Sequence, residues 1–273
     1  MTRLAFTTLA ATTIAASAEV CSVGGGIFHD MHDGDMKKMV VDGTGLTITP
    51  YNNKEQWTVY ANLDDDCTAS IDFHVPGKPG YPPVNLTATL WQLTSFAGGR
   101  KVGVEFTDPS GTLADATTPL NLWLEPNAAA NAAAAANNNT NTNNHNHNHA
   151  ETCIATKAGH GTVFDDMHDG DQKNVASQTE GGAEHMLIRP YNNNQTWAVD
   201  APFDPKDCTA LVDFNVPGKP GPPPVSLTAT VWRMTRSAAV QEMKQTVEFT
   251  DPTSTIAPPA TPLNGWVEVI QRS

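Results

Sequence analysis

Basic residues are scarce in this chain. Lys and Arg number 16 against 29 Asp and Glu, which gives a formal net charge of −13. A negative protein repels nucleic acid and anionic membranes, so metal cations and neutral ligands are the partners that charge favours. After the N-terminal segment no apolar run approaches the roughly 18 residues that a membrane span needs, and no hydrophobic tail for a lipid anchor is present, so membrane insertion is not expected.

Catalytic signatures are also lacking. The chain has no serine elbow, no His-Glu-x-x-His metal motif and no glycine loop that would cradle a phosphate. Asp72 and Asp213 recur at equivalent positions, but His74 beside the first is replaced by Asn215 beside the second. An acid–base pair is therefore not shared by the two halves of the chain, and catalysis is kept only as an alternative.

The N-terminus has the layout of a cleavable secretory signal. Arg3 precedes an apolar stretch over residues 4–16, and Ala16-Ser17-Ala18 follows before Glu19. This pattern predicts removal of residues 1–18 and export of the protein to the extracellular space.

The remainder of the chain is a tandem duplication. FHDMHDGDMK at 28–37 returns as FDDMHDGDQK at 164–173, and CTASIDFHVPGKPGYPPV at 67–84 returns as CTALVDFNVPGKPGPPPV at 208–225. Each copy is long enough for one core of ordinary size, which predicts two domains over residues 19–126 and 151–273. Residues 127–150 between them are rich in Asn, Ala and His and predict a disordered tether that lets the domains move independently.

Four cysteines divide two and two between the copies. In an oxidising compartment the simplest pairing joins Cys21 to Cys67 and Cys153 to Cys208, although four cysteines allow three connectivities. Each such bridge would stabilise its domain by about 4 kcal/mol through the closed loop.

Apolar residues alternate with a period of two, which is typical of half-buried β-strands. Ala69, Ile71, Phe73 and Val75 form one inward row, and Val84, Leu86, Ala88 and Leu90 form another. About seven short strands per copy, separated by turns rich in Pro, Gly, Asn and Asp, predict an all-β fold of two tandem antiparallel β-sandwiches, immunoglobulin-like or related.

Three aspartates close to a glycine recur in both copies, and two interpretations stay open. The residues are Asp30, Asp33 and Asp35 in the first copy and Asp166, Asp169 and Asp171 in the second. Their carboxylates offer the hard oxygen ligands that Ca²⁺ prefers, whereas the Asp-Gly pair between apolar residues is equally typical of a hairpin turn. Copper is disfavoured because His29 and Met36 of the first copy are not kept in the second.

The six tryptophans occupy three paired positions. Trp57 and Trp197 share parity with apolar residues and are expected in the core. The other four fall on the parity of polar residues, so regular strands would expose them as a platform for a sugar ring. These four are Trp91, Trp123, Trp232 and Trp266. A one-residue bulge would instead turn each of them inward.

Three sequons predict N-glycosylation, at Asn85, Asn138 and Asn194. Together these features favour a secreted, bivalent binding protein that recognises an extracellular glycan or surface polymer, with Ca²⁺ ordering the aspartate loops. The alternatives are a structural protein of a cell wall or extracellular matrix, and a secreted hydrolase or metal-dependent enzyme. The oligomeric state is left open by the sequence.

Overall fold

The computed structural model describes residues 21, 25–76, 85–126, 153–154, 161–204, 206–219, 226–236, 243–258 and 261–269. The predicted signal segment, the predicted tether and Asn138 lie outside these residues. Within the described part the chain is all-β and antiparallel, without a helix, which confirms the predicted class. No helix in this part is long and apolar enough to cross a membrane.

Among the described residues, each copy contributes eight strands, against the about seven predicted. In the first copy they are β1 (Gly26–Asp30), β2 (Met36–Asp42), β3 (Gly45–Pro50), β4 (Val59–Asn62), β5 (Thr68–Asp72), β6 (Asn85–Ser95), β7 (Arg100–Thr107) and β8 (Pro119–Leu124). In the second copy they are β9 (Thr162–Asp166), β10 (Gln172–Glu180), β11 (Ala183–Pro190), β12 (Val199–Asp204), β13 (Thr209–Asp213), β14 (Ser226–Thr235), β15 (Met243–Thr250) and β16 (Pro262–Glu268).

The strands of the second copy close into a barrel, because β9 pairs with β16 and β13 pairs with β14. The first copy follows the same order, with β1 beside β8 and β5 beside β6. The amide of Asp64, just after β4, donates to the carbonyl of Thr68 at 2.8 Å and draws β4 and β5 together. The predicted all-β class therefore holds, but the predicted two-sheet immunoglobulin-like sandwich does not, since a single sheet curls round each core.

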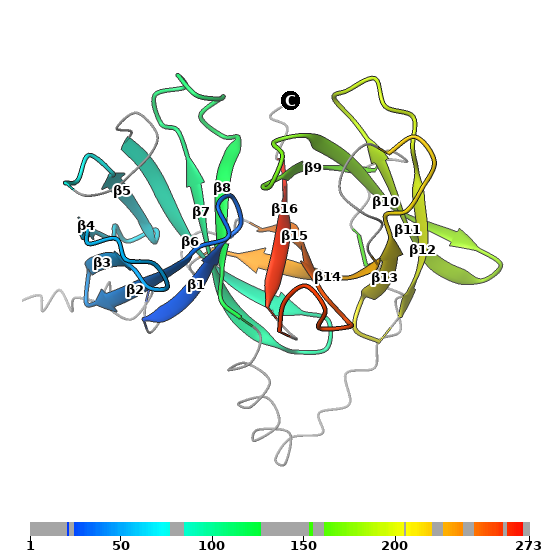
Figure 1. The fold of residues 1–273 in the computed structure, drawn as a ribbon, viewed down its shortest axis with the longest axis horizontal. Helices are drawn as coiled ribbons and strands as arrows, with labels where there is room; N and C mark the ends of the chain where they lie inside the picture. Colours follow the sequence, from blue (N-terminus) through cyan, green and yellow to red (C-terminus); the bar gives the residue numbers. More distant parts are fainter. Residues whose placement is uncertain are drawn as a thin grey trace, which may run out of the picture.

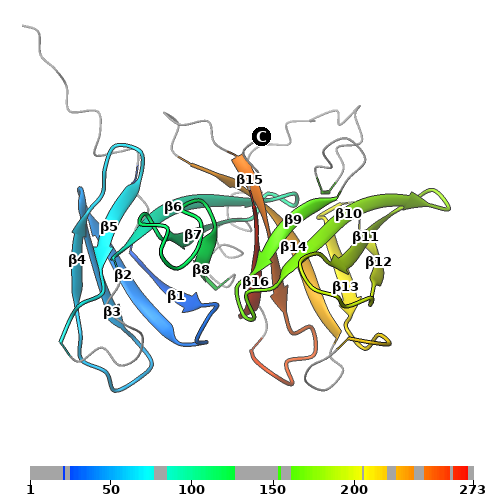
Figure 2. The same cartoon turned by 90° about the horizontal axis from the view of Figure 1, so that it is seen from above.

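The two barrels are joined side by side through one strand pair, β6 with β14 (Figures 1 and 2). Gln92 pairs with Thr235 at one end of this ladder, and Ser95 pairs with Trp232 at the other. All sixteen strands thus belong to one continuous sheet. The expectation of independently moving domains is wrong, because backbone hydrogen bonds and buried side chains cross between the copies.

A separate apolar core fills each barrel. Trp57 and Trp197 are buried there, as their parity predicted. Both predicted disulfides are present, Cys21 with Cys67 and Cys153 with Cys208, which settles the connectivity.

Trp123 and Trp266 also lie in the barrel cores, so the exposure expected of them is wrong. Each packs against a phenylalanine of the neighbouring strand, with ring centroids 4.4 Å apart for Trp123 and Phe106. Their polar neighbours point inward as well: Asn121 donates to Asp30 at 2.7 Å, and Asn264 donates to Asp166 at 2.8 Å. On β8 the row that contains Asn121 and Trp123 thus faces the barrel interior. The apolar row, with Leu122 and Leu124, faces the other copy.

Candidate functional site

The aspartate-rich segments are hairpin turns closed on a buried lysine. In the first copy the turn links β1 to β2, and Gly34 adopts a φ of +74° at its tip. Lys37 places its Nζ 3.5 Å from Asp30, 3.0 Å from Asp33 and 3.8 Å from Asp35, while its own side chain is 5% exposed. The hairpin alternative is the one that the structure shows.

The second copy repeats this arrangement with Lys173 as the central cation. Its Nζ lies 3.5 Å from Asp166, 3.3 Å from Asp169 and 3.9 Å from Asp171. An ammonium group thus stands in both copies where three carboxylates converge. Calcium binding at these loops stays a prediction, and a calcium ion would have to displace the lysine to reach all three acids.

Lys37→Met tests whether the lysine holds this turn. We expect the free energy of unfolding at pH 7 to fall by about 1.5–3 kcal/mol, because the buried carboxylate of Asp30 loses its cation. Burial raises the pKa of Asp30 above its ordinary value. The folded state therefore binds this proton more tightly than the unfolded chain, and the variant should regain stability as the pH falls through the raised pKa towards about 3.9.

Urea unfolding measured between pH 8 and pH 4 gives this dependence. Lys38→Met, at the exposed neighbouring position, is the matched control and should leave stability unchanged. A Lys37→Met variant as stable as the control at every pH would contradict the role given to the lysine.

Trp91 and Trp232 leave the barrel interior as their parity predicted, yet they are only 3% and 4% exposed. They are covered because each lies between the two barrels, in a cluster that both copies build. Its members are Met31, Trp91, Leu93, Leu122, Leu124, Met167, Trp232, Met234 and Val267. The expectation that Trp91 and Trp232 form an exposed sugar platform is wrong, because the other copy occupies that face.

Two buried ion pairs cross between the copies beside these tryptophans. Lys101 of the first copy lies 2.5 Å from Glu248 of the second, and Lys244 of the second copy pairs with Glu105 of the first. Each lysine also lies over the indole next to its glutamate: Lys101 is 4.4 Å from the ring centroid of Trp232. The arrangement is reciprocal, so each copy supplies one cation to the other.

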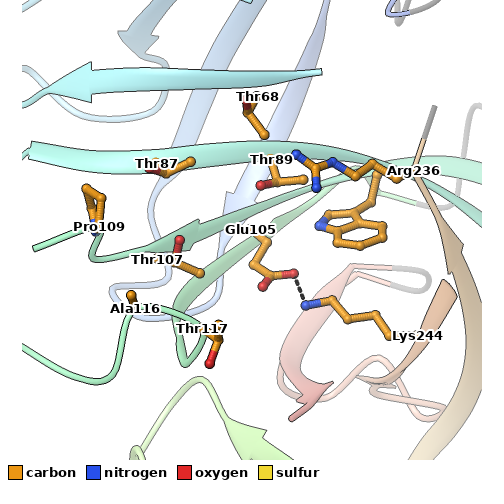
Figure 3. Close-up of a pocket in the computed structure, with 11 residues that line it drawn as sticks. Thr68, Thr87, Thr89, Glu105, Thr107, Pro109, Ala116, Thr117, Arg236 and Lys244 are labelled. Carbon is orange, nitrogen blue, oxygen red and sulfur yellow. Dashed lines mark ion pairs between the residues drawn. The ribbon is translucent and has the colours of Figure 1, made fainter. Parts of the chain in front are cut away.

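A groove of about 430 Å³ opens on the outer face of the first barrel, where the second copy meets it (Figure 3). Its floor comes from β5, β6 and β7, and its end wall comes from the second copy. The lining residues are Thr68, Thr87, Thr89, Trp91, Glu105, Thr107, Pro109, Ala116, Thr117, Arg236 and Lys244. In Figure 3 Lys244 reaches towards Glu105, and Arg236 lies close to Thr89.

Four threonines give the floor of this groove its chemistry. Thr68 pairs directly with Thr89, and Thr87 pairs directly with Thr107, so the four side chains form a stepped row across three neighbouring strands. All four are half-buried. A pleated sheet spaces such positions by about 4.8 Å across strands and by about 6.8 Å along them, so the hydroxyls form a regular polar array.

The loop after β7 forms a side wall and is organised by one carboxylate. Asp108 accepts hydrogen bonds from the Ser110 hydroxyl at 2.6 Å, the Leu113 amide at 2.7 Å and the Thr112 hydroxyl at 3.0 Å. The Ser110 hydroxyl and the Leu113 amide hold the pKa of Asp108 well below its usual range. The loop that carries Pro109 is thereby fixed in place at neutral pH.

The charges round the groove are largely compensated. Lys244 is paired with Glu105, and Arg236 donates to Asp66 at 2.7 Å. Asp165 lies close enough to Lys244 for their charges to interact, and burial raises the pKa of its carboxyl. The Thr68 hydroxyl donates to Asp66 at 2.6 Å, whereas Thr87, Thr89 and Thr107 line the groove with hydroxyls that can bind a ligand. A groove with paired charges and such hydroxyls suits a neutral, hydrogen-bonding ligand better than an ion.

No family model, no curated protein and no solved structure matches this chain. The groove must therefore be interpreted from its own residues.

The sequence carries a signal for this groove. The Leu-Thr-Ala-Thr echo before Trp91 and Trp232 places two threonines on one strand face in each copy. The second copy repeats these pairings, since Thr209 pairs with Thr230 and Thr228 pairs with Thr250, although Thr250 is buried. The end wall differs, since Ser95 stands at the position equivalent to Arg236.

The remaining predicted sites lie away from the groove floor or outside the described residues. Asn85 and Asn194 are exposed, as a glycosylated asparagine must be, and their modification stays a prediction. A surface cluster that sequence reasoning missed joins Glu180, His185 and Asp200, whose ligand atoms lie within 4.8 Å of one another. His185 is already hydrogen-bonded to Asp200 at 2.7 Å.

Proposed function

We propose that the protein is a secreted binding protein that recognises a neutral, hydroxyl-rich polymer, such as an extracellular glycan, in the threonine-lined groove. The observation that carries this proposal is the stepped row of four half-buried threonines beside compensated charges. Hydroxyl groups donate and accept, so they can pair with the hydroxyls of a sugar in either direction. The groove volume of about 430 Å³ falls in the range of small-ligand sites, roughly 300–1,000 Å³.

The sugar would thus bind to the threonine-lined groove, and not to exposed tryptophans as the sequence predicted. Secretion rests on the signal-like N-terminus and is supported by the two disulfides, which persist in oxidising compartments. Bivalent binding is a further part of the proposal, because the same threonine pairs recur on the second barrel.

Thr89→Val tests the groove directly. This change keeps the side-chain shape and removes one hydroxyl, and we expect roughly a 3- to 10-fold loss of affinity for the neutral oligosaccharide that binds best on a glycan array. Isothermal titration calorimetry gives both the affinity and the number of sites. Thr230→Val is the matched variant on the second barrel.

The two variants separate the possible outcomes. If only the first groove binds, the titration gives one site and Thr230→Val leaves the affinity unchanged. If both barrels bind, the titration gives two sites and each variant weakens one of them. Wild-type chain that binds no sugar on the array, or Thr89→Val with wild-type affinity at every site, would overturn the proposed function.

A further inference from the structure

The contact between the copies has the symmetry of a homodimer interface within one chain. Leu93 of β6 pairs with Met234 of β14, and these two residues occupy equivalent positions in the duplicated sequence. An antiparallel pair of equivalent residues marks a two-fold axis. The crossed ion pairs obey the same axis, since Lys101 and Lys244 are equivalent, as are Glu105 and Glu248.

One pair of equivalent residues breaks this symmetry where the barrels touch. Leu122 of β8 faces its counterpart Gly265 of β16 across the interface. A Cβ added at Gly265 would lie 2.9 Å from Leu122 Cδ2 and 3.4 Å from Leu124 Cδ1. The leucine of one copy thus fills the space left by the glycine of the other.

Like copies would fit each other poorly at this point. Two first copies would bring Leu122 against Leu122 in a space that holds one leucine, and overpacking of that kind distorts side chains and backbone. Two second copies would place Gly265 against Gly265 and leave a void, which also costs stability. Both like pairs would keep the crossed lysine–glutamate contacts, so these ion pairs do not discriminate between like and unlike pairs, whereas the Leu122–Gly265 fit does.

A second contact favours the unlike pair over two first copies. Arg236 of the second copy donates to the carboxylate of Asp66 at 2.7 Å and to its carbonyl at 3.0 Å. Ser95 takes the place of Arg236 in the first copy and is too short to repeat this contact.

We infer that this face of each copy is a recognition surface whose specific partner is the other copy, and that the Leu122–Gly265 fit makes unlike pairing strongly preferred over like pairing. The covalent link through residues 127–150 is then not needed to hold the barrels together. Its effect is to supply the two partners in equal number.

The test uses the full chain with a protease recognition sequence inserted within residues 127–150. After folding, oxidation and cleavage, size-exclusion chromatography and native mass spectrometry at micromolar concentration show which fragments stay associated. We expect one species, the one-to-one complex of unlike fragments. Separated fragments, or like pairs in the proportions that random association gives, would overturn the inference.

Gly265→Leu in the same cleavable chain should weaken the complex at least tenfold, because it removes the space for Leu122. The control is the reversed pair, Leu122→Gly with Gly265→Leu, which restores one leucine opposite one glycine and should restore the complex. A Gly265→Leu complex as tight as wild type contradicts the inference. A reversed pair as weak as Gly265→Leu alone contradicts it too, since the loss would then reflect damage to the second barrel.

Discussion

Glu248→Ala is expected to lower the free energy of unfolding by about 3–5 kcal/mol, because it leaves the buried ammonium of Lys101 without its ion-pair partner. Both side chains of this pair are almost fully buried, at 1% and 0% exposure, so water cannot take over the lost contact. The variant also removes the acceptor of the Trp232 indole, which donates to Glu248 at 2.7 Å. Urea denaturation with both disulfides intact measures the loss.

The double variant Lys101→Met with Glu248→Gln is the control for this prediction. It removes both charges and keeps an amide oxygen for the Trp232 indole, so we expect less than half of the single-variant loss. A double variant as unstable as Glu248→Ala would show that the cost comes from packing and not from the unpaired charge.

The pH dependence of Glu248→Ala provides a second check. Burial lowers the pKa of Lys101, and Glu248 opposes that shift. Without Glu248 the folded state gives up the lysine proton more readily, while the unfolded chain keeps it up to about pH 10.4. The unfolded state then binds more protons, so the stability of the variant should rise with pH between neutrality and pH 10.

Removal of the first disulfide is the second large effect that we expect. Cys21→Ser with Cys67→Ser should cost about 4 kcal/mol, since the bridge closes a loop of 46 residues and restricts the unfolded chain. Thermal unfolding followed by circular dichroism gives the change.

The backbone at Cys67 allows a sharper form of this experiment. Its φ is +62°, in the left-handed region that side chains other than glycine rarely adopt. Cys21→Ser with Cys67→Gly should therefore be more stable than the double serine variant by about 1 kcal/mol. The second copy is the matched repeat, because Cys208 has a φ of +55°. Equal stability of the serine and glycine versions in both copies would contradict the strain argument.

Much of the fold follows from the sequence by local reasoning. The period of two predicted strands such as Thr68–Asp72, and the even division of cysteines predicted the bridge between Cys21 and Cys67. Barrel closure was beyond such reasoning. It depends on the pairing of β9 with β16, which are distant in the chain, and periodicity does not specify which strands become neighbours.

The error over the tryptophans has two different physical causes. Trp91 does lie on the outer face of its barrel, as the alternation predicted. The sequence did not show that the second copy covers this outer face. For Trp123 the prediction of an outer face was wrong because it relied on the polar neighbour Asn121, which in fact points into the barrel and donates to the buried carboxylate of Asp30. A polar residue in an alternating pattern therefore predicts a solvent-facing side chain only if no buried polar group is available to hydrogen-bond with it.

The threonine groove was hidden for a related reason. Its floor can be read from the Leu-Thr-Ala-Thr echo, but its end wall needs Arg236 and Lys244 from the second copy. A site that two copies share is not visible in either copy alone.

The long strand β6 changes its neighbour half-way along its length. Before Trp91 it pairs with β5 of its own barrel, and from Gln92 to Ser95 it pairs with β14. A first copy without the second would present this half-strand as a bare edge beside apolar side chains, which is the kind of surface that recruits further strands and seeds aggregation. Gene duplication within one chain therefore protects this edge in every molecule, even at concentrations too low for separate subunits to meet.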